Sequence, residues 1–333
     1  MKFIITEHNI TGCWYGRRPA DTSVDPLALK VILQGFCSWV NGVAHMSHTK
    51  ISGATAPFTV HVRDCACHES DFMIVLWLSS NRPGDDVYAI SADDPPNGTQ
   101  QVDVHHVPDG SIAGIPAFFF VDAANNRLLT FRHEKIRTNG RPQFDATMKD
   151  YMSLHSNELQ RNHRVDDDGT NVVSIEMRGP DGELLKPKFE SEVKENQAQT
   201  ADILRRSGEI RRIIRVQDIS KKPVEEKKAA ARQLFSLMGA SIEHEDVSDA
   251  RKIKCEIDVH LTREDVENII RQQSDASGDE RYAFEFKGDS KRVWADKCIA
   301  RRTIDINLSA DGPQNLTAQN FLDVIEARRD NIV

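Results

Sequence analysis

The sequence predicts an α+β fold: a mixed, largely antiparallel sheet forms the body with helices, and a smaller β-α-β-α module accompanies it. Apolar runs of strand length, separated by turn residues, dominate residues 58–132. Helical periodicity is confined to a few segments, and strands alternate with helices in a compact pattern only near residues 205–275. This order lacks the regular βαβ succession of a Rossmann domain and favours α+β.

The first 160 residues supply most of the body. The run 72–78 is apolar throughout, which is typical of a strand at the centre of a sheet. Phe118 and Phe120 should face one side of the sheet and Phe119 the other, because side chains alternate along a strand. The expected strands are 1–10, 58–62, 72–78, 87–90, 114–122 and 127–132, and the expected helices are 25–39 and 142–159.

The character of the chain changes near residue 161. We expect a second domain over 161–275, with 1–160 and 276–333 as the body. Thr262 and Asp265 have the spacing of a capping box at a helix start, with aspartate in place of the usual glutamate. The expected strands are 172–177, 211–219, 253–259, 282–286 and 299–308, and the expected helices are 224–238 (with Gly239 as C-cap), 262–272 and 317–329.

Composition narrows the class of protein. The 333 residues carry a net charge of −8, which excludes a uniformly basic nucleic-acid binder. Six scattered cysteines do not form a disulfide framework and favour a reduced, cytoplasmic protein. No run of 18 apolar residues occurs, and the N-terminus lacks the pattern of a signal peptide. We therefore expect a soluble chain that does not insert into a membrane.

Positive charge is concentrated between residues 203 and 232. Ten basic residues face four acidic ones there, a net charge of +6. Such a surface suits a phosphate backbone, and its binding would weaken with salt. The alternative is a solvated helix face with local ion pairs, since Glu225 and Glu226 adjoin two of the lysines. The ten residues are Arg205, Arg206, Arg211, Arg212, Arg215, Lys221, Lys222, Lys227, Lys228 and Arg232.

A second basic run follows the phenylalanine-rich strand. It contains the candidate DNA-binding residues Arg132, Lys135, Arg137 and Arg141. No aromatic residue lies between these side chains, so stacking on bases is not indicated. No helix-turn-helix or zinc-finger pattern is present, so sequence-specific readout is not indicated either.

Catalytic alternatives rest on weaker patterns. Glu285 and Lys287, with Asp258 on another strand, could form a magnesium-dependent nuclease site. The segment 61–68 holds two histidines and two cysteines, but its Cys-x-Cys spacing is too tight for a zinc knuckle. We expect no catalytic residue, metal or cofactor, and keep the nuclease as an alternative function.

Two stretches together resemble a known family. Gly114-Ile-Pro-Ala-Phe-Phe-Phe-Val-Asp122, with an arginine in the following hairpin near Arg132, resembles the RexA proteins of lambdoid phages. Leu234-Phe-Ser-Leu-Met-Gly-Ala240, the acidic run to Asp249 and the strand 252–259 follow in the same order. The resemblance spans roughly residues 70–310. RdgC proteins are more distantly similar. The resemblance also suggests KwaB of the Kiwa defence system as a further relative.

The resemblance implies a function as well as a fold. It implies a homodimer that binds double-stranded DNA without sequence preference, in anti-phage defence or phage exclusion. It also implies a body with a movable second domain and a partner effector protein located at a membrane. A third alternative, besides the DNA binder and the nuclease, is an adaptor that binds only protein.

Overall fold

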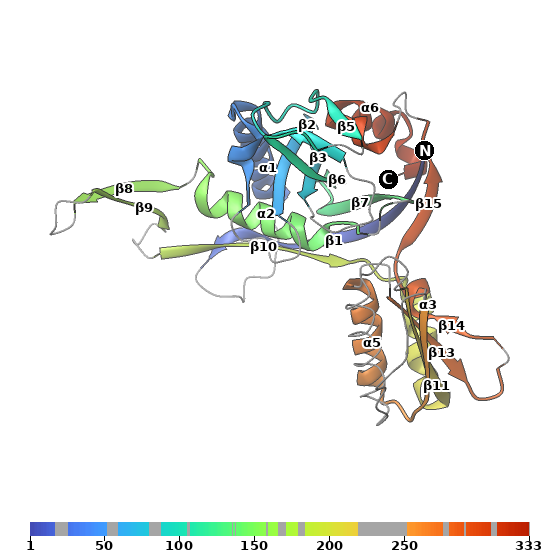
Figure 1. Ribbon diagram of the computed structural model, residues 1–333. Helices are drawn as coiled ribbons and strands as arrows, with labels where there is room; N and C mark the ends of the chain where they lie inside the picture. The colour runs from blue at the N-terminus through green and yellow to red at the C-terminus, as the bar shows by residue number, and fades with distance from the viewer. Residues whose placement is uncertain are drawn as a thin grey trace, which may run out of the picture. The chain divides into compact units, whose positions relative to one another are not determined.

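A computed structural model gives the fold of this chain. It describes residues 1–16, 26–51, 59–79, 88–104, 107–134, 136, 138–157, 159–165, 171–178, 184–218, 252–275, 280–289, 291–307 and 312–332. The fold is α+β with largely antiparallel sheets, as predicted (Figure 1).

The chain divides into two compact units. The first comprises residues 1–81, 86–192 and 302–333, and the second comprises residues 82–85 and 193–301. The second unit thus begins at 193, where the sequence suggested 161, and continues beyond 275. Strand pairing explains both differences: 171–178 joins the large sheet through 184–193, whereas 280–286 pairs with 210–218.

The described strands at the centre of the first unit form an 11-stranded sheet. Its main path runs β2-β3-β6-β7-β1-β10-β9-β8, with β15 beside β1 and the short β4 and β5 beside β6. The strand pairs whose register is defined are antiparallel. The strands are β1 (Lys2–Gly16), β2 (Thr59–His68), β3 (Asp71–Ser79), β4 (Tyr88–Ser91), β5 (Val102–Val104), β6 (Ser111–Asp122), β7 (Arg127–His133), β8 (Gln160–Val165), β9 (Asn171–Arg178), β10 (Leu184–Val193) and β15 (Arg301–Asp305).

Helices cover both faces of this sheet. The side chains of α1 (Pro26–Gly42) and α2 (Arg141–Leu154) pack with Phe119 on one face, and those of α6 (Ala318–Ala327) pack with Phe118 and Phe120 on the other. All three phenylalanines are fully buried, which confirms the predicted alternation. The short helices are η1 (Met46–Thr49), η4 (Pro313–Asn315) and α7 (Arg329–Ile332).

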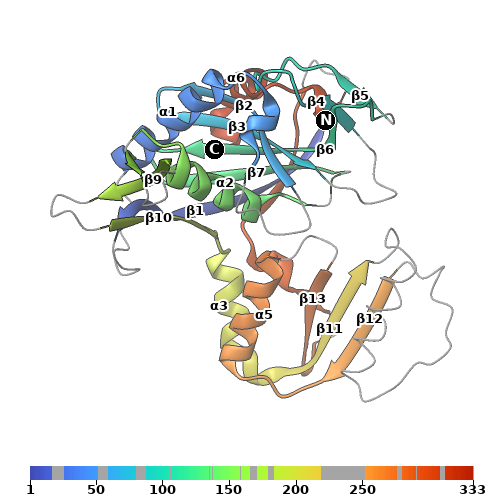
Figure 2. The same ribbon diagram turned by 60° about the vertical axis from the view of Figure 1, so that its left-hand side comes forward.

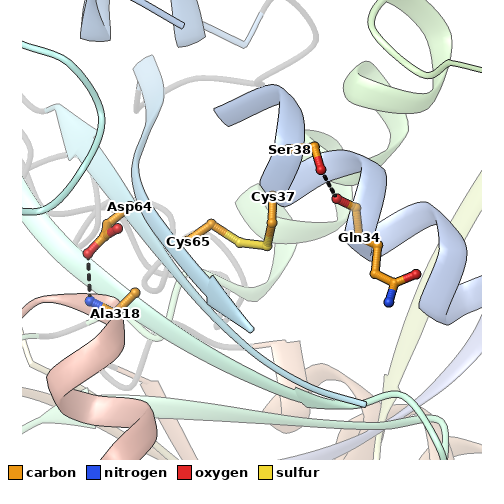
Figure 3. Close-up of a disulfide and its surroundings, with 6 residues drawn as sticks. All are labelled: Gln34, Cys37, Ser38, Asp64, Cys65 and Ala318. Carbon is orange, nitrogen blue, oxygen red and sulfur yellow. Dashed lines mark hydrogen bonds between the residues drawn. A yellow bond between two sulfur atoms is a disulfide. The ribbon is translucent and has the colours of Figure 1, made fainter. Parts of the chain in front are cut away.

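Adjacent residues of β2 tie the sheet to helices on opposite faces. Cys65 forms a disulfide with Cys37 of α1, and the Cα atoms are 5.4 Å apart (Figure 3). Asp64 accepts a hydrogen bond of 2.6 Å from the backbone N–H of Ala318, at the start of α6. The expectation of a chain without disulfides was therefore wrong for one pair, because the fold brings α1 beside β2 across 28 residues of sequence.

In the described residues of the second unit, a four-stranded sheet has two helices, α3 and α5, packed on one face (Figure 2). The order is β12-β11-β13-β14, and the buried core includes Ile203 of α3, Ile270 of α5 and Phe284 of β13. The elements are α3 (Gln197–Arg205), η2 (Ser207–Glu209), β11 (Ile210–Asp218), β12 (Lys252–Asp258), α5 (Arg263–Asp275), β13 (Glu280–Phe286), β14 (Val293–Trp294) and η3 (Ala295–Cys298).

The predicted capping box is present at the start of α5. Asp265 donates its backbone N–H to the Thr262 hydroxyl over 3.2 Å, and its carboxylate accepts from the Thr262 backbone N–H over 2.9 Å. The predicted helix 224–238 and Gly239 lie outside the described residues. No helix among the described residues is long and apolar enough to span a membrane.

Candidate nucleic-acid interface

The arginines of β11 do not gather on one face of the second unit's sheet. Arg212 pairs in register with Asp258 of β12 and Glu285 of β13, and a register shift lies between Ile210 and Arg212. Arg215 pairs in register with Tyr282. Because Arg215 comes three residues after Arg212 on the same strand and side chains alternate, the two arginines point to opposite faces of the sheet. The predicted basic cluster is divided by the pleat of the strand.

Arg212 is the centre of an ion-pair network. Its Nε donates to the Asp258 carboxylate over 2.7 Å. Its Nη1 lies 3.4 Å from the Glu256 carboxylate and 3.7 Å from that of Glu285. Arg211 also pairs with Glu285. Hydrogen bonds and charge attraction from Arg212 lower the pKa of Asp258 below its ordinary value.

The network continues along β12. Glu256 pairs with Lys254 and lies 3.0 Å from Arg292, and these cations lower its pKa, Lys254 most of all. The network thus contains four cations and three carboxylates, with a net charge of +1. The cations are Arg211, Arg212, Lys254 and Arg292, and the carboxylates are Glu256, Asp258 and Glu285. Most of the positive charge expected on this face is therefore neutralised by neighbouring strands.

The remaining described arginines of the segment are also paired. Arg205 lies 2.6 Å from Asp202. Arg206 lies 2.9 Å from Glu209 and 2.7 Å from Asp289, and its guanidinium is 4.2 Å from the ring centroid of Phe286. Arg215 pairs with Glu280.

The sequence predicted that the basic residues of 203–232 form a positive surface with few opposing charges. This expectation is corrected, because each described arginine of the segment pairs with a carboxylate. Five of the carboxylates involved come from residues 256–289 and lie outside the window 203–232 in which charge was counted. Glu256 and Asp258, two residues apart on the predicted strand 253–259, were the feature of the sequence that could have indicated these acidic partners. Lys221, Lys222, Lys227, Lys228 and Arg232, which make up half of the cluster's basic residues, lie outside the described residues.

The second basic run holds the first unit together at two of its positions. Arg132 donates to the backbone carbonyl of Ile136 over 2.6 Å. Arg141 donates to the carbonyl of Ser191 in β10 and lies 3.5 Å from Asp145. These two arginines make structural contacts within the first unit, while their predicted neighbours Lys135 and Arg137 lie outside the described residues.

The two strand carboxylates of the proposed nuclease site are already in ion pairs. Asp258 and Glu285 both contact arginine, which competes with a cation for their oxygens. Within the described ranges, no group of three or more His, Cys, Asp or Glu side chains is placed to hold a metal.

The histidine- and cysteine-rich strand is also engaged in other contacts. Cys65 is in the disulfide, His61 Nδ1 lies 3.3 Å from the Met46 carbonyl oxygen, and His68 Nδ1 lies 2.8 Å from Glu326. Burial lowers the pKa of His61. These three side chains are thus distributed among separate structural contacts.

Charge is distributed unequally between the units. The first unit has 20 Lys and Arg against 29 Asp and Glu, a net charge of −9. The second has 23 against 22, a net charge of +1. A polyanion that approaches the molecule is repelled by the first unit and not by the second.

Comparisons with known proteins return no relative. The chain matches no protein-family model, and neither curated proteins nor solved structures show a match. What the chain does must therefore be inferred from its charge distribution and from the contacts described above.

Proposed function

We propose that this protein binds double-stranded DNA without sequence preference through its second unit, as a component of anti-phage defence or phage exclusion. The single observation that carries the proposal is the charge difference between the units, −9 against +1. The defence role, and a partner effector located at a membrane, come from the resemblance to RexA proteins.

The ion pairs of the second unit suit weak, exchangeable contact with phosphate. An arginine held by a carboxylate at a protein surface can instead donate two parallel N–H groups to a phosphate oxygen pair. The competing carboxylates reduce the gain from each contact. We therefore expect micromolar or weaker affinity, within the range of about 10⁻⁴ to 10⁻⁶ M that non-specific binders show at physiological salt.

The protein-binding adaptor is the second candidate. The complete pairing of the described arginines of residues 205–215 favours it, because paired charges present less field to a polyanion than free ones. The nuclease is the weakest of the three, since arginines hold both of its strand carboxylates.

Two matched sets of lysines test the proposal. Alanine at Lys221, Lys222, Lys227 and Lys228 removes four positive charges from the second unit. Alanine at Lys2, Lys30, Lys50 and Lys149 removes the same charge from the first. Affinity for one duplex is measured by fluorescence anisotropy over a range of salt concentrations.

The proposal predicts that only the second-unit variant binds more weakly. Its slope of log affinity against log salt should fall by about 0.9 for each phosphate that the variant no longer neutralises. Equally weakened binding in both variants would indicate a net-charge effect and contradict the assignment to the second unit. Absence of any binding by the wild-type chain at low salt would favour the adaptor.

A further inference from the structure

Strand β5 lies at an edge of the large sheet of the first unit. In the part of the chain that the structure describes, it pairs with β4 alone, through Val102, Asp103 and Val104. Figure 2 shows it at the margin of this unit. An edge strand presents backbone N–H and C=O groups that can pair with a further strand.

A hydrogen bond on the other side of β4 identifies which backbone groups of β5 face outward. Ala92, directly after β4, donates its N–H to the carbonyl of Gly110, directly before β6, over 3.0 Å. Residues two apart on a strand face the same neighbour, so Ile90 also faces β6, whereas Ala89 faces β5. Ala89 pairs in register with Asp103, and the backbone groups of Asp103 therefore point toward β4.

The two valines beside Asp103 consequently present an open edge. The backbone N–H and C=O groups of Val102 and Val104 point away from β4. Neither residue makes a backbone hydrogen bond on that side to the described part of the chain. An antiparallel strand laid along β5 can therefore bond to the N–H and the C=O of both valines.

The side chains of these valines extend an apolar surface to the edge. Val102 packs against a small buried cluster formed by Met46, Trp77 and Ile90. Val104 lies on the same face of the strand, because side chains two apart share a face, and it is 45% exposed. An apolar side chain on an added strand would remove Val104 from water.

The charge around this edge is negative. Residues 83–126 contain seven aspartates and no lysine, arginine or glutamate. Asp103 lies on β5 itself, on the face opposite the valines, and Asp93 and Asp109 are exposed in the segments that follow β4 and precede β6. No ion pair links these three carboxylates to another residue of the described ranges. They favour a positively charged partner, which the net charge of −9 on the first unit also attracts.

We propose that β5 binds an extended, basic segment of a partner protein, which pairs antiparallel with it as an additional strand. Antiparallel pairing is slightly more stable per residue than parallel pairing. The sequence Val-Lys-Val complements Val-Asp-Val of β5, because valine then lies opposite valine on one face and lysine lies opposite Asp103 on the other. The proposal concerns the first unit and does not depend on DNA binding by the second.

A labelled peptide of sequence Lys-Val-Lys-Val-Lys-Val-Lys and two N-methylated derivatives test the backbone pairing. One derivative is methylated on the valine nitrogens and the other on the lysine nitrogens, so all three carry the same charge. A peptide valine opposite Val104 directs its N–H toward β5, whereas the lysine N–H groups point away. Methylation of the valines should weaken binding to the wild type by about tenfold or more, and methylation of the lysines should leave it unchanged. Fluorescence anisotropy measures all three affinities.

Variants of the chain locate the site. Val104→Pro removes an outward N–H without changing the net charge or the bonds of Asp103 to β4, and it should weaken binding of the unmethylated peptide by about tenfold. Asp103→Asn should weaken it by about two- to fivefold. Asp323→Asn, at an exposed position of α6, is the matched control and should bind like the wild type. Thermal unfolding verifies the fold of each variant.

The methylated peptides decide the proposal even if Val104→Pro fails to fold, because they are measured on the wild type. Equal affinity for all three peptides would show attraction by charge alone and overturn the proposal. Loss of affinity through lysine methylation only, or a folded Val104→Pro that binds like the wild type, would also overturn it. Self-association of the wild type that Val104→Pro abolishes would assign the edge to a second copy instead.

Discussion

Ion pairs between residues far apart in the sequence decide what the arginines of β11 can contact. Arg212 and its principal partner Asp258 are separated by 46 residues, and Arg211 and Glu285 by 74. A local charge count finds the arginines but not their partners, because the partners become neighbours only through strand register. The sequence thus predicted that these arginines lie on a strand, but it did not predict that carboxylates of β12 and β13 neutralise them.

The Arg212 network gives a pH-dependent prediction. Arg212→Ala removes the main cause of the lowered pKa of Asp258. A carboxyl whose folded pKa is lowered stabilises the fold above its unfolded pKa, and this contribution is lost as the pH falls through the folded pKa. The variant should therefore be less stable than wild type at pH 7, and the difference should shrink as the pH falls below about 4, the ordinary pKa of an aspartate. Urea unfolding across that range measures it, and a difference that grows on acidification would contradict the network.

Asp145 gives a prediction of opposite sign. It accepts a hydrogen bond of 2.7 Å from the Ser191 hydroxyl, between α2 and β10, and burial raises its pKa to about 6. A raised folded pKa means that the stabilising contribution is present below the unfolded pKa and is lost as the pH rises through 6. A shift of this size corresponds to roughly 3 kcal/mol.

We expect the wild type to gain stability relative to Asp145→Asn as the pH falls from about 7.5 to about 4, across the raised pKa. The asparagine variant keeps an acceptor for Ser191 but does not titrate. Asp323→Asn, at an exposed position of α6, is the control for the change of an aspartate to asparagine in itself. Parallel stability curves for wild type and Asp145→Asn would refute a buried, titrating Asp145.

Elements with a strong local signal were predicted well, and those that depend on tertiary contacts were not. The apolar runs of β3 and β6 and the capping box of α5 were recognised from the sequence because their burial or their cap is encoded locally. Strand β10 and helix α3 were missed. Strand β10 buries only Phe189 and Ser191 in its polar sequence, and α3 begins after Asn196 within a polar run.

The disulfide between α1 and β2 belongs to the same class of missed contact. Closing a loop of 28 residues should stabilise the fold by about 3–4 kcal/mol through the unfolded chain. We expect a reducing agent to lower the urea midpoint of the wild type and to leave that of Cys37→Ser/Cys65→Ser unchanged. The control is Cys67→Ser, at an exposed free thiol, which should respond like the wild type. Equal midpoints for wild type with and without reductant would argue against the bond in solution.

At the scale of the whole molecule, the two units differ in charge and in construction. The large unit is a sheet covered by helices on both faces and carries −9, whereas the small unit has a sheet with its described helices on one face and carries +1. The sequence predicted a second domain over 161–275, whereas the second unit comprises residues 82–85 and 193–301, because its boundaries follow from strand pairing that sequence periodicity does not specify. The same strand pairing places the carboxylates of Glu256, Asp258 and Glu285 beside the arginines of β11.

The most direct measurement is the affinity of the full-length chain for three unrelated duplexes at about 50 mM and about 200 mM salt. Phosphate contacts carry no sequence information, and their counterion release makes binding depend on salt. The account predicts similar dissociation constants for all three duplexes, and a fall in affinity of about tenfold or more between the two salt concentrations. Strong preference for one duplex, or affinity that does not change with salt, would contradict it.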